Sequence, residues 1–358
     1  MTHVFVAPHP DDVALSCGGL IASLRELGQA VTIITVFSGN QPDQGPLTTY
    51  QREALGFGNK TMWPATEAFN RSDIMADYPD AALVPSWAAT PDRLEATQTE
   101  ADQAAKRFWQ RSSWYRRASI YAEPIAGQPL ADDISTQGAV LTDELMAVAD
   151  AGDLMAKRRI EDERFAYFAE ASIVFLDLPD AVFRGYTGDD ELLGMPRADD
   201  IAPYEMLRRE IARLEPQKVY LPLGVGGHVD HQLCREVGIG MLQEPRPWVM
   251  PGPDYADQVV FYEDFPYAWW NDFRHLENLG AGVLAELPPD ISIFPTYADI
   301  EDQVERKIMG IGLYESQIDR LFDGTKAMAS AVRTYGRLLG EQGEVAGAAE
   351  RYWVTSRV

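Results

Sequence analysis

The sequence predicts an α/β fold in which helices cover both faces of a mostly parallel sheet. Short apolar runs rich in β-branched residues alternate with longer segments in which apolar residues recur at helical spacing. This alternation is typical of parallel strands joined by helices. Several of these runs end in loops of Gly, Pro and Asp. The chain of 358 residues is 46% apolar, as in globular proteins, and no apolar run is long enough to span a membrane.

The first unit is an apolar strand at residues 4–7 that ends in a polar loop, His9-Pro10-Asp11-Asp12. A helix is expected from Leu15 to about residue 27, because apolar residues recur there at helical spacing. Open α/β sheets place their binding sites in the loop between such a strand and helix. One imidazole and two carboxylates within four residues are typical of a metal site.

The same pattern of strand and helix continues along the chain. Gly28 closes the first helix, and the β-branched run that follows predicts a second parallel strand. This second strand is expected at 31–37, and further strands at 172–176, 218–223 and 259–262. Further helices are expected at about 91–114, 142–151, 157–170, 203–214, 231–242, 299–322 and 326–339.

A second group of metal-binding residue types follows the strand at 218–223. The glycine-rich run 224–227 leads there into His228-Val229-Asp230-His231. The chain has five histidines, and three of them lie in these two short segments. Because both groups follow buried strands, which end at one edge of a parallel sheet, we expect them to form one metal site.

The formal net charge of −24 excludes two classes of partner. Nucleic acid and anionic membrane surfaces both attract basic proteins, so neither is expected to bind here. The N-terminus enters strand residues without a charged and then apolar leader, which predicts a cytoplasmic protein.

These motifs together resemble the PIG-L/LmbE-like family of zinc-dependent de-N-acetylases. The resemblance rests on the two histidine motifs and on four further segments, Leu15-Ser16-Cys17-Gly18-Gly19, Arg159-Ile160-Glu161-Asp162, Leu178-Pro179-Asp180 and Tyr314-Glu315-Ser316-Gln317. It covers about residues 1–50 and 155–320. It implies a single catalytic domain over 1–358 with a Rossmann-like sheet. The connection after the second strand is generally much shorter in that family, so residues 58–150 are interpreted as a large insertion, either a cap over the pocket or a contact between copies in a homo-oligomer.

The resemblance also implies roles for individual residues. His9, Asp12 and His231 would be the ligands of one Zn²⁺ per chain, which matches the three protein ligands and open fourth position of catalytic zinc. Asp11 would then take a proton from the attacking water, and His228 would stabilise the oxyanion as an imidazolium and protonate the leaving amine. Asp230 would orient an imidazole, with His228 as the expected partner. In addition, Arg159 and Asp180 match positions that contact substrate in the family, although a surface salt bridge is an equally good interpretation of both.

The function that follows is zinc-dependent removal of an acetyl group from an N-acetylglucosaminyl-type amine, in a small-molecule amino sugar or glycoconjugate. One alternative is an amidase acting on a larger conjugate or an antibiotic intermediate. The other is a metal-containing sugar-binding protein without catalysis. Asp11 and His228 argue against the last, because zinc binding alone needs neither.

Overall fold

The computed structural model describes residues 2–39, 47–56, 154–200, 203–243, 255–269 and 287–357. The predicted insertion at 58–150 lies outside these residues, so its interpretation stays a prediction. The two helices expected within it, at about 91–114 and 142–151, lie outside them as well.

The described part is built on a seven-stranded sheet in the order β3-β2-β1-β4-β5-β7-β6. Its strands are β1 (Thr2–Ala7), β2 (Ala30–Thr35), β3 (Ser172–Phe175), β4 (Lys218–Pro222), β5 (Val259–Tyr262), β6 (Ile291–Asp299) and β7 (Ala349–Arg357). The pairs among β1 to β5 are all parallel, whereas β7 pairs antiparallel with β5 and with β6. The prediction of a mostly parallel α/β sheet is confirmed. The two antiparallel strands β6 and β7 were not predicted.

The described helices largely match the predicted segments. They are α1 (Asp12–Glu26), α2 (Thr49–Ala54), α7 (Leu154–Phe168), α8 (Asp189–Leu192), α9 (Tyr204–Leu214), α10 (Val229–Gln243), α12 (Val304–Ile311), α13 (Glu315–Leu321) and α14 (Gly324–Gln342), with short 3-10 helices at Ala181–Phe183, Tyr255–Asp257 and Glu301–Gln303. The single helix expected over 299–322 is wrong. The helix is interrupted between α12 and α13. In this interval Tyr314 is buried, and its hydroxyl donates to Asp162 Oδ1 at 2.6 Å.

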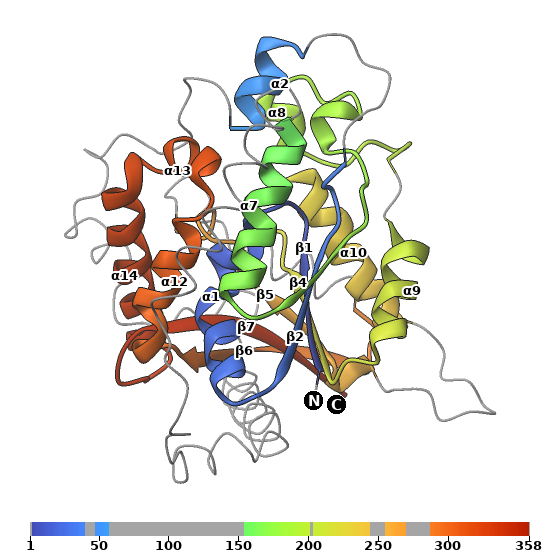
Figure 1. Cartoon of the computed structure of the whole chain (residues 1–358). Helices are drawn as coiled ribbons and strands as arrows, with labels where there is room; N and C mark the ends of the chain where they lie inside the picture. The colour runs from blue at the N-terminus through green and yellow to red at the C-terminus, as the bar shows by residue number, and fades with distance from the viewer. Residues whose placement is uncertain are drawn as a thin grey trace, which may run out of the picture.

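The direction of the sheet connections reverses between the neighbouring strands β1 and β4. From β1 the chain continues through α1 to β2 on one side, and from β4 it continues through α10 to β5 on the other. Helices α1, α12 and α14 lie over one face of the sheet, with α9 and α10 over the opposite face (Figure 1). The crevice beyond the carboxyl ends of β1 and β4 is therefore where this architecture places a ligand.

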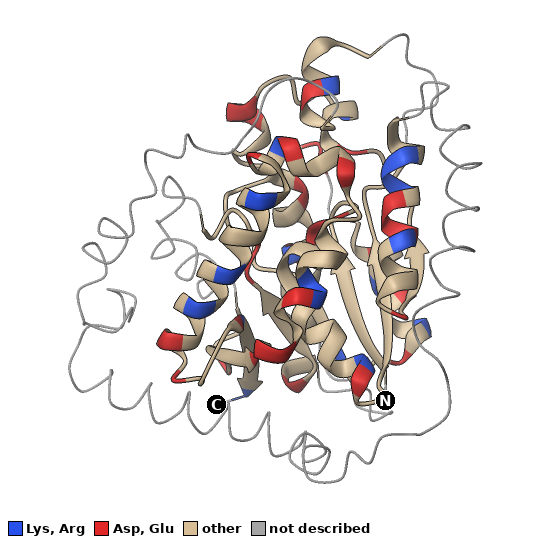
Figure 2. Cartoon of the chain, turned by 60° about the vertical axis from the view of Figure 1, so that its left-hand side comes forward, with Lys and Arg blue, Asp and Glu red and all other residues tan. Residues whose placement is uncertain are grey.

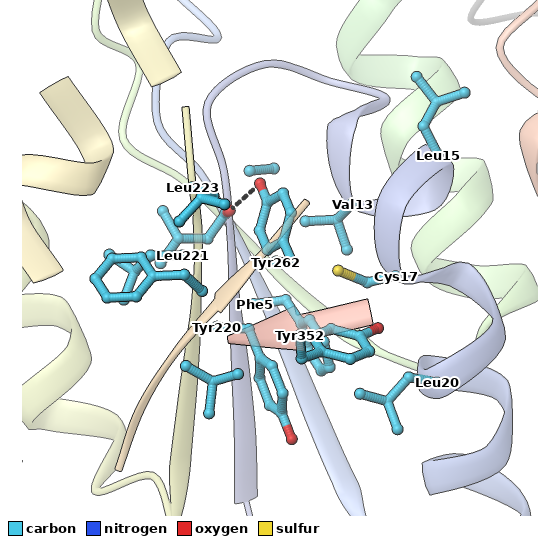
Figure 3. Close-up of a cluster of buried hydrophobic side chains, with 14 of the residues drawn as sticks. Phe5, Val13, Leu15, Cys17, Leu20, Tyr220, Leu221, Leu223, Tyr262 and Tyr352 are labelled. Carbon is cyan, nitrogen blue, oxygen red and sulfur yellow. Dashed lines mark hydrogen bonds between the residues drawn. The ribbon is translucent and has the colours of Figure 1, made fainter. Parts of the chain in front are cut away.

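A continuous apolar core holds these two strands in register. Val4 pairs with Val219 in the sheet, and the rings of Phe5 and Tyr220 stack with their centroids 4.2 Å apart. Figure 3 shows this cluster between the strands and α1, with the Tyr262 hydroxyl donating to the Val6 carbonyl at 2.9 Å. The buried hydroxyl thus has a hydrogen-bond partner. The ends of β1 and β4, which carry the polar motifs, are supported by this packed core.

Charged residues of both signs are interspersed along the outer helices in Figure 2. Among the described helices, none combines the length and apolarity that crossing a bilayer requires.

Candidate metal centre and active site

The loop after β1 directs two successive carboxylates to different partners. Asp11 is the residue before α1 and has a φ of 112°, a backbone conformation that costs about 1–3 kcal/mol in a non-glycine residue and is found mostly at functional sites. The Asp12 carboxylate turns back to accept the backbone N–H of His9 at 2.7 Å. Asp11 instead lies beside Arg158, with its Oδ1 3.5 Å from Arg158 Nη2.

The loop after β4 brings the second motif against the first. Gly226 has a φ of 88°, and a Cβ added there would lie 2.6 Å from a ring atom of Tyr267, so this turn requires glycine. It leads directly into α10, whose first turn carries Asp230 and His231. The ring centroid of His9 lies 4.7 Å from that of His228 and 5.4 Å from that of His231. The two motifs therefore meet, as the sequence predicts.

Asp12 lies between the two predicted histidine ligands. Its Oδ2 is 3.3 Å from His9 Nδ1 and 3.4 Å from His231 Nε2. A tetrahedral zinc with bonds of about 2.0–2.1 Å has ligand atoms about 3.3–3.4 Å apart. Each distance suits an ion shared by Asp12 and that histidine.

The other nitrogen of each histidine ring is held by a buried carboxylate. His9 Nε2 lies 2.8 Å from Asp230 Oδ2, and His231 Nδ1 lies 2.6 Å from Asp264 Oδ1. This arrangement is typical of metal-binding histidines, whose second nitrogen donates to an acceptor. Asp230 thus does orient an imidazole, but the prediction of His228 as its partner is wrong. The reason is that α10 directs the Asp230 side chain to His9, Arg184 and the Ala181 N–H, while only its backbone N–H meets His228.

Two overlapping groups of potential ligand atoms converge on His9. The ring nitrogens of His9, His228 and His231 lie within 4.8 Å of one another, as do ligand atoms of His9, Asp180 and Asp230. A three-histidine set is therefore the alternative to the predicted one. It is disfavoured because His228 Nδ1 accepts the Asp230 N–H at 3.2 Å, so the other nitrogen of the neutral ring, Nε2, carries the proton and has no lone pair for a metal.

Electrostatics at the site favour a bound cation. Burial lowers the pKa of His9, but Asp12, Asp180 and Asp230 together raise it to about 10. Burial likewise lowers the pKa of His231, while Asp12 and Asp264 raise it above the usual value. Protonation of these rings and metal binding compete, so a bound metal ion would displace protons from them.

Asp11 and His228 have pKa values shifted in opposite directions. Burial raises the pKa of Asp11 to about 8, with Arg158 opposing the shift and Asp12 adding to it. Burial lowers the pKa of His228 well below its ordinary value, and the nearby His9 adds to this effect. This direction runs against an imidazolium at His228, whose charge state stays a prediction. Since Nδ1 accepts a hydrogen bond, the proton of the neutral ring is on Nε2.

The site opens into a pocket whose empty volume is about 540 Å³ when the adjoining open solvent is included. Its described lining combines groups of the two motifs with residues from α2, α8, α13 and the loops after β3 and β5; these are His9, Asp11, Asp12, Leu15, Ala54, Arg158, Asp180, Val182, Leu192, His228, Pro266, Tyr267, Gln317, Arg320 and Leu321. Asp180 lines the pocket as predicted, and its carboxylate also accepts the Val182 N–H at 3.1 Å. Metal site, free carboxylate, imidazole and substrate space are thus contiguous.

Arg159 is not among the described residues that line the pocket, whereas its neighbour Arg158 is, so a substrate contact of Arg159 stays a prediction. Arg159 Nη1 donates to the Ser38 carbonyl at 3.0 Å and lies beside the exposed Asp177 carboxylate. Arg158 is buried in the pocket wall, where Nη2 donates to the Pro10 carbonyl at 3.0 Å. Successive residues of a helix point about 100° apart, so these two adjacent arginines of α7 leave the helix on different sides.

The segments 159–162 and 314–317, which carry part of the family resemblance, stabilise this wall of the pocket by hydrogen bonds. Glu161 on α7 accepts the Ser316 N–H at 2.9 Å, and Asp162 accepts the Tyr314 and Thr35 hydroxyls, both at 2.6 Å. These buried hydrogen bonds tie α7 to the start of α13 and to β2. They are structural, and they fix the helix that carries Arg158.

Sequence reasoning missed Arg158, Arg184 and Asp264. Asp264 had a usable signal, since it follows the predicted strand 259–262 and so ends at the same sheet edge as the two motifs. Arg184 had none, because its contacts with Asp200 and Asp230 join loops that are separate in sequence.

Comparison with known proteins agrees with this geometry. Residues 4–108 match the PIG-L family model, described as GlcNAc-PI de-N-acetylase. The chain is 32% identical over 177 residues to 2'-N-acetylparomamine deacetylase of Streptomyces fradiae. That alignment spans 48% of this chain and 57% of the relative. Over its N-terminal part the chain is thus similar to the PIG-L family, and it spans little more than half the length of this curated relative.

Solved structures extend the agreement in fold over the whole chain. A deacetylase–teicoplanin complex matches with a TM-score of 0.53 at 17% identity, covering 100% of this chain and 99% of that one. The zinc-inhibited form of teicoplanin deacetylase matches with a TM-score of 0.52 at 17% identity, with the same coverage. At this identity the structural matches establish the LmbE-like fold.

Proposed function

We propose that this chain is a zinc-dependent hydrolase that removes the acetyl group from an N-acetylglucosaminyl-type amine. The observation that carries the proposal is the position of Asp12 Oδ2, at 3.3 Å from His9 Nδ1 and 3.4 Å from His231 Nε2, beside a pocket that also contains Asp11 and His228. Simple metal storage requires neither a free carboxylate nor a free imidazole.

His9, Asp12 and His231 would hold one zinc ion. When bound, zinc supplies a Lewis acid and lowers the pKa of water to about 7. Asp11, which is oriented by Arg158, accepts a proton from the attacking water when its carboxyl is ionised, which requires a pH above its raised pKa or the charge of the bound metal nearby. His228 donates its Nε2–H to the carbonyl oxygen as negative charge develops there. Asp11, once protonated, is the group that returns a proton to the leaving amine.

Arg158 and Asp180 are the groups we assign to substrate hydroxyls or the amide. Arg158 Nη1 lies 3.7 Å from Asp180 Oδ2, and both residues are buried in the pocket lining. A guanidinium beside a carboxylate offers donors and acceptors together, which suits a ring bearing several hydroxyl groups.

A larger natural-product substrate is the second candidate. It is favoured by the relative in Streptomyces fradiae, named for an acetylated aminoglycoside, and by structural neighbours named for teicoplanin. For this chain the substrate would then be an acetylated amino sugar within an antibiotic intermediate.

The function is tested with a panel of N-acetylated amino sugars, N-acetylated aminoglycosides and glycopeptide intermediates, assayed for release of free amine. Zinc is titrated into the assay, because a neighbour of this fold is described in a zinc-inhibited form. We expect release that rises with zinc up to about one equivalent. Absence of release from every compound, with zinc bound, would favour the sugar-binding alternative.

The adjacent arginines provide a matched pair for the substrate wall. We expect Arg158→Gln to lower kcat/KM by about 10- to 100-fold, since a hydrogen bond to a charged group contributes about 1.5–3 kcal/mol. Arg159→Gln is expected to stay within about twofold of wild type. Steady-state kinetics on the best substrate of the panel measure both. A larger loss in Arg159→Gln would restore the assignment made from sequence.

A further inference from the structure

Asp264 joins one histidine of the metal site to the turn that precedes it. This residue lies just beyond β5 and is buried. Its Oδ1 is 2.6 Å from His231 Nδ1, while Oδ2 accepts the backbone N–H groups of Gly224 and Val225, both at 2.8 Å. One carboxylate therefore bridges the tip of β4, the first turn of α10 and the tip of β5.

We propose that Asp264 is a positioning residue that fixes His231 in the tautomer carrying its proton on Nδ1. The Nε2 atom, 3.4 Å from Asp12 Oδ2, is then the nitrogen free to bind metal. This inference rests on the metal site of the proposed function. It identifies Asp264 as a residue that the site needs although it is not itself a metal ligand.

The contacts of Asp264 require a carboxylate rather than an amide. Oδ2 is surrounded by two N–H donors, and Oδ1 faces the ring nitrogen, so both oxygens must be acceptors. An asparagine would turn its single oxygen to the two backbone N–H groups and its NH₂ to His231. Nδ1 would then have to accept, and the ring proton would move to Nε2, which could no longer bind metal.

The arrangement mirrors the one at His9 through the opposite ring nitrogen. Asp230 holds His9 by Nε2 at 2.8 Å, which leaves Nδ1 towards Asp12. Asp230 is also paired with Arg184, whereas Oδ2 of Asp264 is held by the dipoles of two backbone N–H groups. The two histidines are thus expected to bind metal through different nitrogens, each selected by its own carboxylate.

The test measures zinc affinity in Asp264→Asn by competition with a chromophoric chelator. We expect a 10- to 100-fold loss of affinity, the effect typical of removing the partner of a metal-binding histidine. Glu350→Gln is the matched control, because Glu350 is also a buried carboxylate that accepts two backbone N–H groups, those of Gly19 and Leu20, both at 2.9 Å. Both variants are expected to lower Tm, but the control should bind zinc like wild type.

A second measurement uses the wild-type protein, so it does not depend on whether a variant folds. Nitrogen-15 spectra of the zinc-loaded chain report which ring nitrogen carries a proton. We expect Nδ1–H at His231 and Nε2–H at His9. Zinc bound through Nδ1 of His231, or Asp264→Asn with unchanged zinc affinity, would overturn the inference while leaving the proposed function intact. A wild-type chain that bound no zinc would instead overturn the proposed function itself.

Discussion

Asp12→Ala is expected to lose tight zinc binding, whereas His228→Ala is expected to keep it. Asp12 Oδ2 lies at tetrahedral spacing from nitrogens of His9 and His231, so its removal takes away one of three protein ligands. Loss of the hydrogen-bond partner of a metal-binding histidine typically lowers metal affinity by about 10- to 100-fold. Loss of a ligand itself should lower zinc affinity by more than that. His228 holds the Asp230 N–H through Nδ1 and is assigned to the oxyanion, so the ligand set remains complete without it.

Metal content after dialysis and a chelator competition measure both variants. His231→Ala serves as the positive control, since His231 belongs to the predicted set and to the three-histidine alternative. Zinc retained by Asp12→Ala but lost from His228→Ala would establish the three-histidine set. The roles that we assign to Asp12 and His228 would then be exchanged.

Asp11→Asn is expected to keep its zinc and to lose about 10²- to 10⁴-fold in kcat, the range typical of general base catalysis. The substitution removes the proton acceptor and preserves the shape of the side chain. Asparagine is also among the residues that best tolerate a positive φ, so the backbone at 112° should not rearrange. Zinc content, far-UV circular dichroism and kcat on one substrate together separate lost chemistry from lost structure.

The contrast with His228→Ala refines this prediction. Both variants should lose mainly kcat rather than substrate affinity, because base and oxyanion donor act where charge develops in the transition state. An Asp11→Asn protein with wild-type kcat would mean that another group accepts the proton. The carboxylate of Asp180, which lines the same pocket, would then be the candidate to substitute.

The strands of the parallel part of the sheet and the polar loops at their ends could be predicted because each signal is local. Apolar runs such as residues 4–7 and 218–223 report burial on both faces, and the polar motifs follow them directly. The antiparallel strands β6 and β7 were missed. They pair with each other over nine residues each, and such pairing depends on partners far away in sequence.

Errors at the site arose where a decision depended on side-chain direction. Arg158 and Arg159 are equivalent in the sequence, and only the packing of α7 against the loop after β1 determines which one faces the pocket. Asp230 stands two residues from His228, yet the turn into α10 directs its carboxylate to His9. Spacing along a chain places residues at one edge of the sheet but does not say which of their atoms meet.

The sequence by itself determined the α/β class, the two strand ends that carry the histidine motifs, and the set of residue types available for a metal. Only the tertiary structure decided that Asp12 lies between His9 and His231, that Asp230 and Asp264 hold the outer nitrogens of those rings, and that burial lowers the pKa of His228. The physical reason is the distance along the sequence over which the deciding interactions act. Strand and helix formation are specified by neighbouring residues, whereas tautomer, pKa and metal geometry are set by groups that the folded sheet brings together from five separate loops and helices.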